Sequence, residues 1–79
     1  MRDEDIWQAI VAAVREEIGD SLQAVTPDMT AGDIPGWDSI THVRIVMNAE
    51  IACGATLDIS KTYRARTIGD LVPILRAAM

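Results

Sequence analysis

The stretch GWDSITHVRIVMNAE, residues 36–50, joins a helix start to a run of apolar residues at helical spacing. Asp38 directly precedes this run, so its carboxylate is placed to accept a free backbone N–H of the first turn as an N-cap. Ser39 is then the first helical residue, close to solvent and beside the positive end of the helix dipole. Such a position favours a phosphate bonded to the serine hydroxyl. Local sequence equally allows Asp38 and Ser39 to be an ordinary helix start.

The helix that begins here is predicted over residues 39–53, and its apolar residues fall on two faces. A domain this small cannot bury both faces of one helix fully, so we expect one to be core and the other a contact surface. The alternative for the second face is partial burial against the preceding loop. The expected core face holds Ile45, Val46, Ala49 and Cys53, and the expected contact face holds Ile40, Val43 and Met47.

Upstream, an amphipathic helix is predicted over residues 6–18, because Ile6, Ile10, Val14 and Ile18 recur every four positions, and Gly19 closes it. Residues 19–38 hold five glycines and prolines without periodicity, which indicates a long loop. Loops of this length are uncommon in small domains and are usually functional. Four apolar residues are expected to hold the loop against the core: Leu22, Val25, Met29 and Ile34.

Downstream of a turn at Gly54, residues 59–63 predict a short helical piece, and the sequence TIGD opens a last helix. Within TIGD, Thr67 and Asp70 have the spacing of a capping box. Pro73 would break a hydrogen bond in a helix interior but is tolerated in a first turn, so we expect a kink or a late start with Asp70 as N-cap. The fold class is therefore all-α: residues 1–79 are predicted to form one domain, a small irregular four-helix bundle with a short third helix.

Composition narrows the function. A chain of 79 residues forms a small core with little room for an enclosed active site. Its one cysteine cannot form an internal disulfide, and one histidine with one thiol falls short of a structural zinc site, so no metal is expected. The net charge of −5 disfavours nucleic acid. The acidic N-terminus and the lack of a long apolar run predict a cytoplasmic protein with no membrane partner, which we expect to be a monomer.

Three further side chains invite functional interpretation. His42 lies three residues after Ser39, which suggests a Ser–His nucleophile pair. However, no acidic residue is placed to orient the imidazole, and we therefore expect no catalytic residue and a histidine that leans on the core or loop. Trp37 is expected to make a staple-like contact between the incoming chain and the first turns of the helix. Cys53 is expected to be a buried core residue.

The stretch GWDSITHVRIVMNAE, the long Pro/Gly loop before it and RTIGDLVPIL after it together resemble the acyl carrier proteins, in which an Asp-Ser-Leu motif opens the second helix. The resemblance covers nearly the whole chain. It implies that Ser39 receives 4′-phosphopantetheine from coenzyme A through a phosphopantetheinyl transferase, and that the thiol of this arm holds an acyl group as a thioester. The chemistry then belongs to the arm and to partner enzymes of acyl-activating, acyltransferase or ketosynthase type.

The resemblance also implies a partner-binding face on the second helix, made of Ile40, Val43, Arg44, Met47 and Glu50. Carriers for fatty-acid synthesis usually have acids after the Ser-Leu pair, in the middle of this helix and through the third helix. Here only Glu50 keeps its charge, and the other places hold Thr41, Arg44, Ile51, Ala52, Ser60, Lys61 and Arg64. Because charge complementarity governs association rate and partner choice, we expect a dedicated pathway, such as polyketide or modified-lipid assembly, rather than housekeeping fatty-acid synthesis.

Two alternatives stay open. An aminoacyl or peptidyl carrier would use the same arm, although such carriers more often lack the aspartate before the serine. A helical protein-interaction module would use Asp38 and Ser39 only as a cap. Since the core is chiefly aliphatic and contains methionine, we also hypothesise that it parts to shelter an acyl chain.

Overall fold

The computed structural model describes residues 1–19 and 24–79, which form helices, turns and connecting segments without a strand. The predicted all-α fold is confirmed. The elements in chain order are α1 (Asp3–Ile18), η1 (Ala31–Asp33), α2 (Ser39–Cys53), η2 (Ile59–Arg64), η3 (Ile68–Asp70) and α3 (Leu71–Ala77), where η marks a 3-10 helix. None of the helices in the described ranges has the length and hydropathy of a bilayer span.

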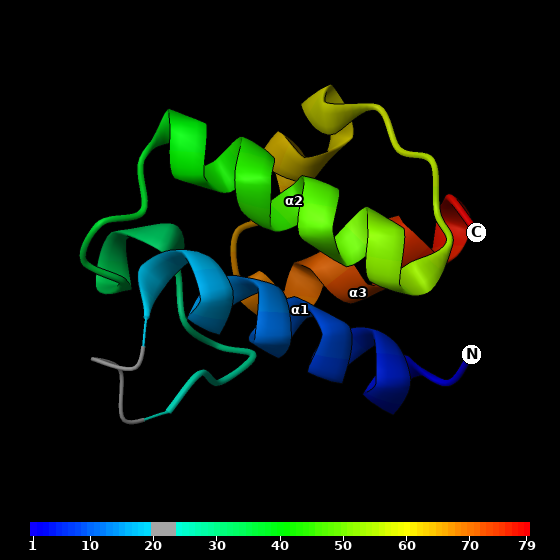
Figure 1. Cartoon of the computed structure of the whole chain (residues 1–79), viewed down its shortest axis with the longest axis horizontal. Helices are drawn as coiled ribbons and strands as arrows, with labels where there is room; N and C mark the ends of the chain where they lie inside the picture. The colour runs from blue at the N-terminus through cyan, green and yellow to red at the C-terminus, as the bar shows by residue number, and fades with distance from the viewer. Residues whose placement is uncertain (20–23) are drawn as a thin grey trace.

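The two long helices form the framework of the bundle. Figure 1 shows α1 and α2 side by side and antiparallel, with α3 packed beside α1 and η2 on the opposite side of α2 from α1. Both chain ends lie at the same end of the molecule. The Arg76 guanidinium joins them, because it pairs with the Asp3 carboxylate and donates to the Met1 carbonyl.

The first helix begins earlier than its apolar period predicts. The prediction placed its start at Ile6, whereas α1 begins at Asp3. The added turn holds only acids, which the positive end of the helix dipole favours but which no hydrophobic period can reveal. The Asp5 carboxylate also accepts the backbone N–H of Arg2, three residues earlier. The predicted end is confirmed, because Gly19 closes the helix with φ 92°.

The core lies between the inward faces of α1, α2 and α3. The predicted core face of α2 is confirmed, since all four of its residues are buried. From the long loop, Ile34 is buried and Val25 and Met29 are half-buried against the core, as predicted, while Leu22 lies outside the described residues. The loop also contains the turn η1, which its aperiodic sequence did not predict. The buried apolar residues of α1 are Ile6, Ile10, Ala13 and Val14.

The last helix starts late, which was one of the two outcomes predicted for TIGD. Residues 68–70 form the tight turn η3, and α3 follows from Leu71 with Asp70 at the N-cap position. The Asp70 carboxylate accepts the backbone N–H of Thr67, as the capping-box spacing predicted. Pro73 is the third residue of α3, where its missing N–H costs no intrahelical bond. The predicted piece at 59–63 is η2, which extends one residue further to Arg64.

Two backbone hydrogen bonds fasten the long loop to the start of α3. The N–H of Ile68 donates to the Met29 carbonyl at 2.8 Å, and the N–H of Gly69 donates to the Pro27 carbonyl at 2.9 Å. The two backbones approach so closely that a Cβ at position 69 would lie 2.7 Å from the Pro27 Cβ and 2.9 Å from the Pro27 oxygen. Only glycine fits this contact without displacing the loop.

We therefore expect Gly69→Ala to lower the free energy of unfolding by about 1–3 kcal/mol, the usual cost of overpacking. Chemical denaturation of the purified variant measures this change. Gly32→Ala is the matched control, because the added methyl meets only the Thr30 Oγ1 at 3.7 Å. An equal effect of both variants on stability would contradict the importance of this contact.

Candidate functional site

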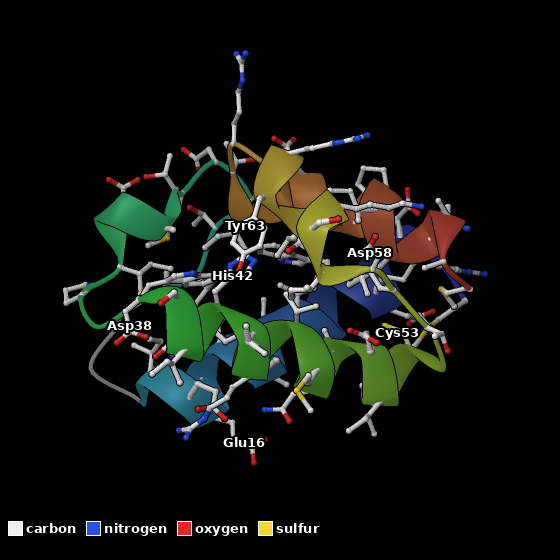
Figure 2. All side chains as sticks on the ribbon, turned by 90° about the horizontal axis from the view of Figure 1, so that it is seen from above. Glu16, Asp38, His42, Cys53, Asp58 and Tyr63 are labelled. Carbon is white, nitrogen blue, oxygen red and sulfur yellow. The ribbon has the colours of Figure 1, made fainter. Side chains whose placement is uncertain are left out.

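Ser39 is the first residue of α2, and its side chain is exposed. Asp38 before it has an extended backbone, and its Oδ1 accepts the N–H of Thr41 at 2.8 Å. The Asp38 carbonyl accepts the N–H of His42 at 2.9 Å. The hydrogen bond from Thr41 holds the pKa of the Asp38 carboxyl below its usual range, so the cap is ionised at neutral pH. Figure 2 shows Asp38 at the outer end of α2.

His42 lies one turn further on and links three segments of the chain. Its Nδ1 receives the indole N–H of Trp37 at 3.2 Å, and its Nε2 lies 2.7 Å from the Oγ1 of Thr62 in η2. Its ring stacks on Tyr63 at a centroid distance of 4.6 Å, between α2 and η2 in Figure 2. The expected staple-like contact of Trp37 is therefore present, as a hydrogen bond to His42 across tilted rings.

The hydrogen bonds that join Trp37, His42 and Thr62 show which nitrogen of the His42 ring carries the proton. The Thr62 hydroxyl donates its one hydrogen to the Ile59 carbonyl at 2.6 Å, so it must accept a hydrogen bond from His42. His42 is then the neutral tautomer with its proton on Nε2, and its Nδ1 is free to accept from Trp37. Burial lowers the pKa of His42, and the Trp37 donor acts in the same direction, because a proton on Nδ1 would face another N–H.

This arrangement rules against the Ser–His pair considered from the sequence. A catalytic histidine needs one nitrogen on the serine and the other on a carboxylate. In the structure the Nδ1 of His42 faces an indole N–H, and its Nε2 is bonded to Thr62. His42 thus leans on the loop and on η2, as expected. Within the described part of the chain, no group of three His, Cys, Asp or Glu side chains could hold a metal ion.

Two hollows lie beside the hydrogen-bonded residues Trp37, His42 and Thr62. An outer groove of about 290 Å³ borders Ser39 and is also lined by Asp38 and Tyr63. A smaller inner cavity of about 60 Å³ reaches the buried side chains of Ile68 and Leu71. Both hollows share the same five wall residues: Ala31, Trp37, His42, Thr62 and Ala65.

An apolar stripe is exposed along α2. Ile40 and Met47 are 64% and 54% exposed, whereas Val43, at 37%, is partly covered. Ile51, which is 79% exposed, extends the stripe by one turn. Ile51 is not among the residues predicted for the contact face, because its position drew attention only as the place of a missing acid. Its spacing of four residues from Met47 was the available signal.

The two charged residues of the predicted partner face differ in their surroundings. Arg44 lies beside the stripe, and its Nη1 is 4.0 Å from the Glu17 carboxylate of α1. Glu50 is half-buried, and its Oε2 accepts the N–H of Leu57 at 3.3 Å, which ties the segment after Gly54 back to α2. At the far end of α2, Cys53 is buried as predicted, and burial raises the pKa of its thiol.

These features describe a small helical bundle that presents a serine at a capped helix start, beside an exposed apolar stripe. Comparison with similar proteins identifies the family. The chain is 32% identical over 76 residues to an acyl carrier protein of Renibacterium salmoninarum, covering 96% of this chain and 94% of the relative. It is 33% identical over 75 residues to an acyl carrier protein of Tropheryma whipplei, covering 95% and 92%. One from an Arthrobacter species is 30% identical over 76 residues, covering 96% and 94%.

The chain therefore belongs to the acyl carrier protein family, and it is a carrier rather than an enzyme. No model of a protein family matches the chain. No solved structure matches it significantly.

Burial lowers the pKa of His42 below 6.5, the ordinary value for histidine, and we expect the Trp37 donor to act in the same direction. Between these two pKa values the unfolded chain binds more protons than the folded one, so stability is complete above about pH 6.5 and falls as the pH drops below it. Because the chain has one histidine, its imidazole C–H resonances give the pKa directly by NMR titration.

Trp37→Phe removes the donor and should raise the pKa of His42 toward the ordinary value. Trp7→Phe, a change of the same kind on α1, should leave that pKa unaltered. If the two variants titrate alike, Trp37 does not hold His42 neutral.

Proposed function

We propose that Ser39 is the attachment site of a 4′-phosphopantetheine arm and that this chain carries acyl groups as thioesters on it. The observation that carries the proposal is the exposed hydroxyl of Ser39 at the capped start of α2, in a chain of the acyl carrier protein family. The arm would supply the thiol to which the acyl group is bound. The residues of this chain hold and orient the arm, and partner enzymes perform the chemistry.

The surroundings of Ser39 fit a phosphodiester. The first N–H groups of the 15-residue helix α2 have no intrahelical partner and point toward this end, where the helix dipole is positive. The Asp38 carboxylate, which borders the same groove, is held in place by the Thr41 N–H at 2.8 Å. The outer groove beside Ser39 offers room for the first part of the arm.

Attachment is a simple displacement at phosphorus. The Ser39 oxygen forms the new phosphorus–oxygen bond, the nucleotide part of coenzyme A leaves, and the serine proton passes to the transferase or to solvent. Nothing in the surroundings of Ser39 has to activate the hydroxyl, since the only histidine is committed to Trp37 and Thr62. The phosphopantetheinyl transferase therefore supplies the catalytic base in this proposal.

The apolar stripe is the surface on which we place the partner enzymes. Four large apolar side chains follow Ser39 along α2, so an enzyme that docks there also reaches the attachment site. Of the predicted charged contacts, Arg44 is available at the edge of the stripe, whereas the Glu50 carboxylate already accepts an internal hydrogen bond. Acyl-activating, acyltransferase or ketosynthase-type enzymes are the expected partners.

The charge of this surface supports a dedicated pathway, such as polyketide or modified-lipid assembly. The first turn of α2 has no acid, and η2 ends with the bases Lys61 and Arg64. A partner that recognises an acidic carrier surface would find few attractive charges here. An aminoacyl cargo would use the same site and remains the alternative within carrier proteins.

Co-expression with a promiscuous phosphopantetheinyl transferase should add one arm to the chain, measured by intact mass. Ser39→Ala should abolish the added mass while leaving the helical circular dichroism unchanged. Ser60→Ala is the matched control, because Ser60 is also exposed and lies two residues after Asp58, which caps the helical turn η2. An unmodified wild-type chain would favour the interaction module, in which Asp38 and Ser39 only cap α2.

The loaded protein should be a poor substrate for fatty-acid elongation enzymes. We expect a specificity constant at least tenfold below that of a housekeeping carrier, since a tenfold loss needs only about 1.4 kcal/mol of missing charge interaction. Thr41→Glu, which adds an acid directly after Ser39 and Ile40, should recover part of the rate. Efficient turnover of the wild-type protein would refute the dedicated-pathway inference.

A further inference from the structure

Trp37, His42 and Thr62, which line both the outer groove and the inner cavity, are joined by hydrogen bonds whose direction is fixed. The indole N–H of Trp37 donates to His42, His42 donates to Thr62, and Thr62 donates to the Ile59 carbonyl. Thr62 is only 1% exposed, so its hydroxyl cannot exchange these partners for water. Tyr63 lies against the His42 ring on the solvent side.

The position of these three residues matters for anything attached to Ser39. The outer groove borders Ser39, whereas the inner cavity ends on the buried core residues Ile68 and Leu71. Trp37, His42 and Thr62 line both hollows together with Ala31 and Ala65, so a chain that starts at Ser39 passes along these side chains from the outer groove to the inner cavity. Opening that passage separates hydrogen-bonded groups and leaves a buried hydroxyl and imidazole without partners, which is costly.

The inner cavity offers little to offset this cost. Its volume of about 60 Å³ is a fraction of what a medium-length alkyl chain occupies, so the core would have to part further to admit one. A short acyl group, or one with its own hydroxyl, gains little from an apolar shelter in the first place. Three rings and several polar groups line the outer groove where such a group can remain.

We infer that the Trp37–His42–Thr62 chain is a gate that determines which cargo this carrier shelters. It closes the interior to straight saturated acyl chains, and the carrier is therefore suited to short or polar acyl groups that stay at the surface. His42 is the specificity-determining residue, because it makes both bonds. This inference rests on the proposed attachment at Ser39, and it replaces the expectation that the aliphatic core parts for cargo.

The experiment compares Thr62→Val with Thr62→Ser in the full-length holoprotein loaded with an octanoyl group. Valine has the shape of threonine but no hydroxyl, whereas serine keeps the hydroxyl and both hydrogen bonds. The first readout is the NMR shift of the Ile68 and Leu71 methyl groups on loading. The second is the rate at which hydroxylamine cleaves the thioester, which sheltering slows.

In the wild-type protein and in Thr62→Ser, octanoyl loading should leave the Ile68 and Leu71 methyl shifts in place, and hydroxylamine should cleave as fast as it cleaves octanoyl pantetheine. In Thr62→Val, the methyl groups should shift and cleavage should slow severalfold. His42→Phe, which keeps a ring against Tyr63, should behave like Thr62→Val. A hydroxylated four-carbon acyl group should leave the methyl groups unshifted in all four proteins.

Methyl shifts and slowed cleavage in octanoyl-loaded wild-type protein would overturn the gate, and this result does not depend on whether a variant folds. Equal behaviour of Thr62→Val and Thr62→Ser would overturn it as well. Failure of the proposed function can be told apart from failure of the gate, because it is seen before any acyl group is loaded. Intact mass would then show no arm on Ser39, which refutes the carrier site and the gate together.

Discussion

Burial of one face of α2 against α1 and the core is the constraint on which the site depends. Once Ile45 and Ala49 face inward, the 3.6-residue period sets the direction of every other side chain on the helix. The apolar stripe that begins at Ile40 must then face solvent, and Ser39 lies at the exposed start of the same helix. His42 is carried toward η2 by the same rotation. The presentation of the serine and the apolar surface is thus a consequence of packing.

The start of α2 is fixed from both directions along the chain. Asp38 caps the helix through Thr41, and Trp37 before it is bonded to His42 after it. The loop that brings Trp37 here is itself fastened to the start of α3 through the close contact at Gly69. Contacts from both sides would present Ser39, the attachment site that we propose, to partner enzymes in one orientation.

The charges of the surface and the gate point to the same kind of cargo and partner. A carrier with an apolar docking stripe and few acids depends less on electrostatic steering than an acidic one. The gate that we infer would leave the cargo accessible at the surface, where a partner enzyme could recognise it directly. Both features involve Trp37 and side chains on α2 and η2, so we infer that a few substitutions there would separate this carrier from one that shelters long chains.

The sequence by itself determined the helices, the Asp38 cap and the inward face of α2, because these depend on neighbours within one turn and on a period that is visible in the chain. It also predicted a kink or a late start for the last helix, since the limits on Pro73 and the Thr67–Asp70 spacing are local. Only the tertiary structure decided the partners of His42, because Thr62 is twenty residues away in the chain and no local pattern joins them. The internal bond of Glu50 and the glycine contact with Pro27 were decided in the same way, by atoms that the fold brings together. The added turn of α1 was not predicted for a different reason, because its charged residues show no hydrophobic period.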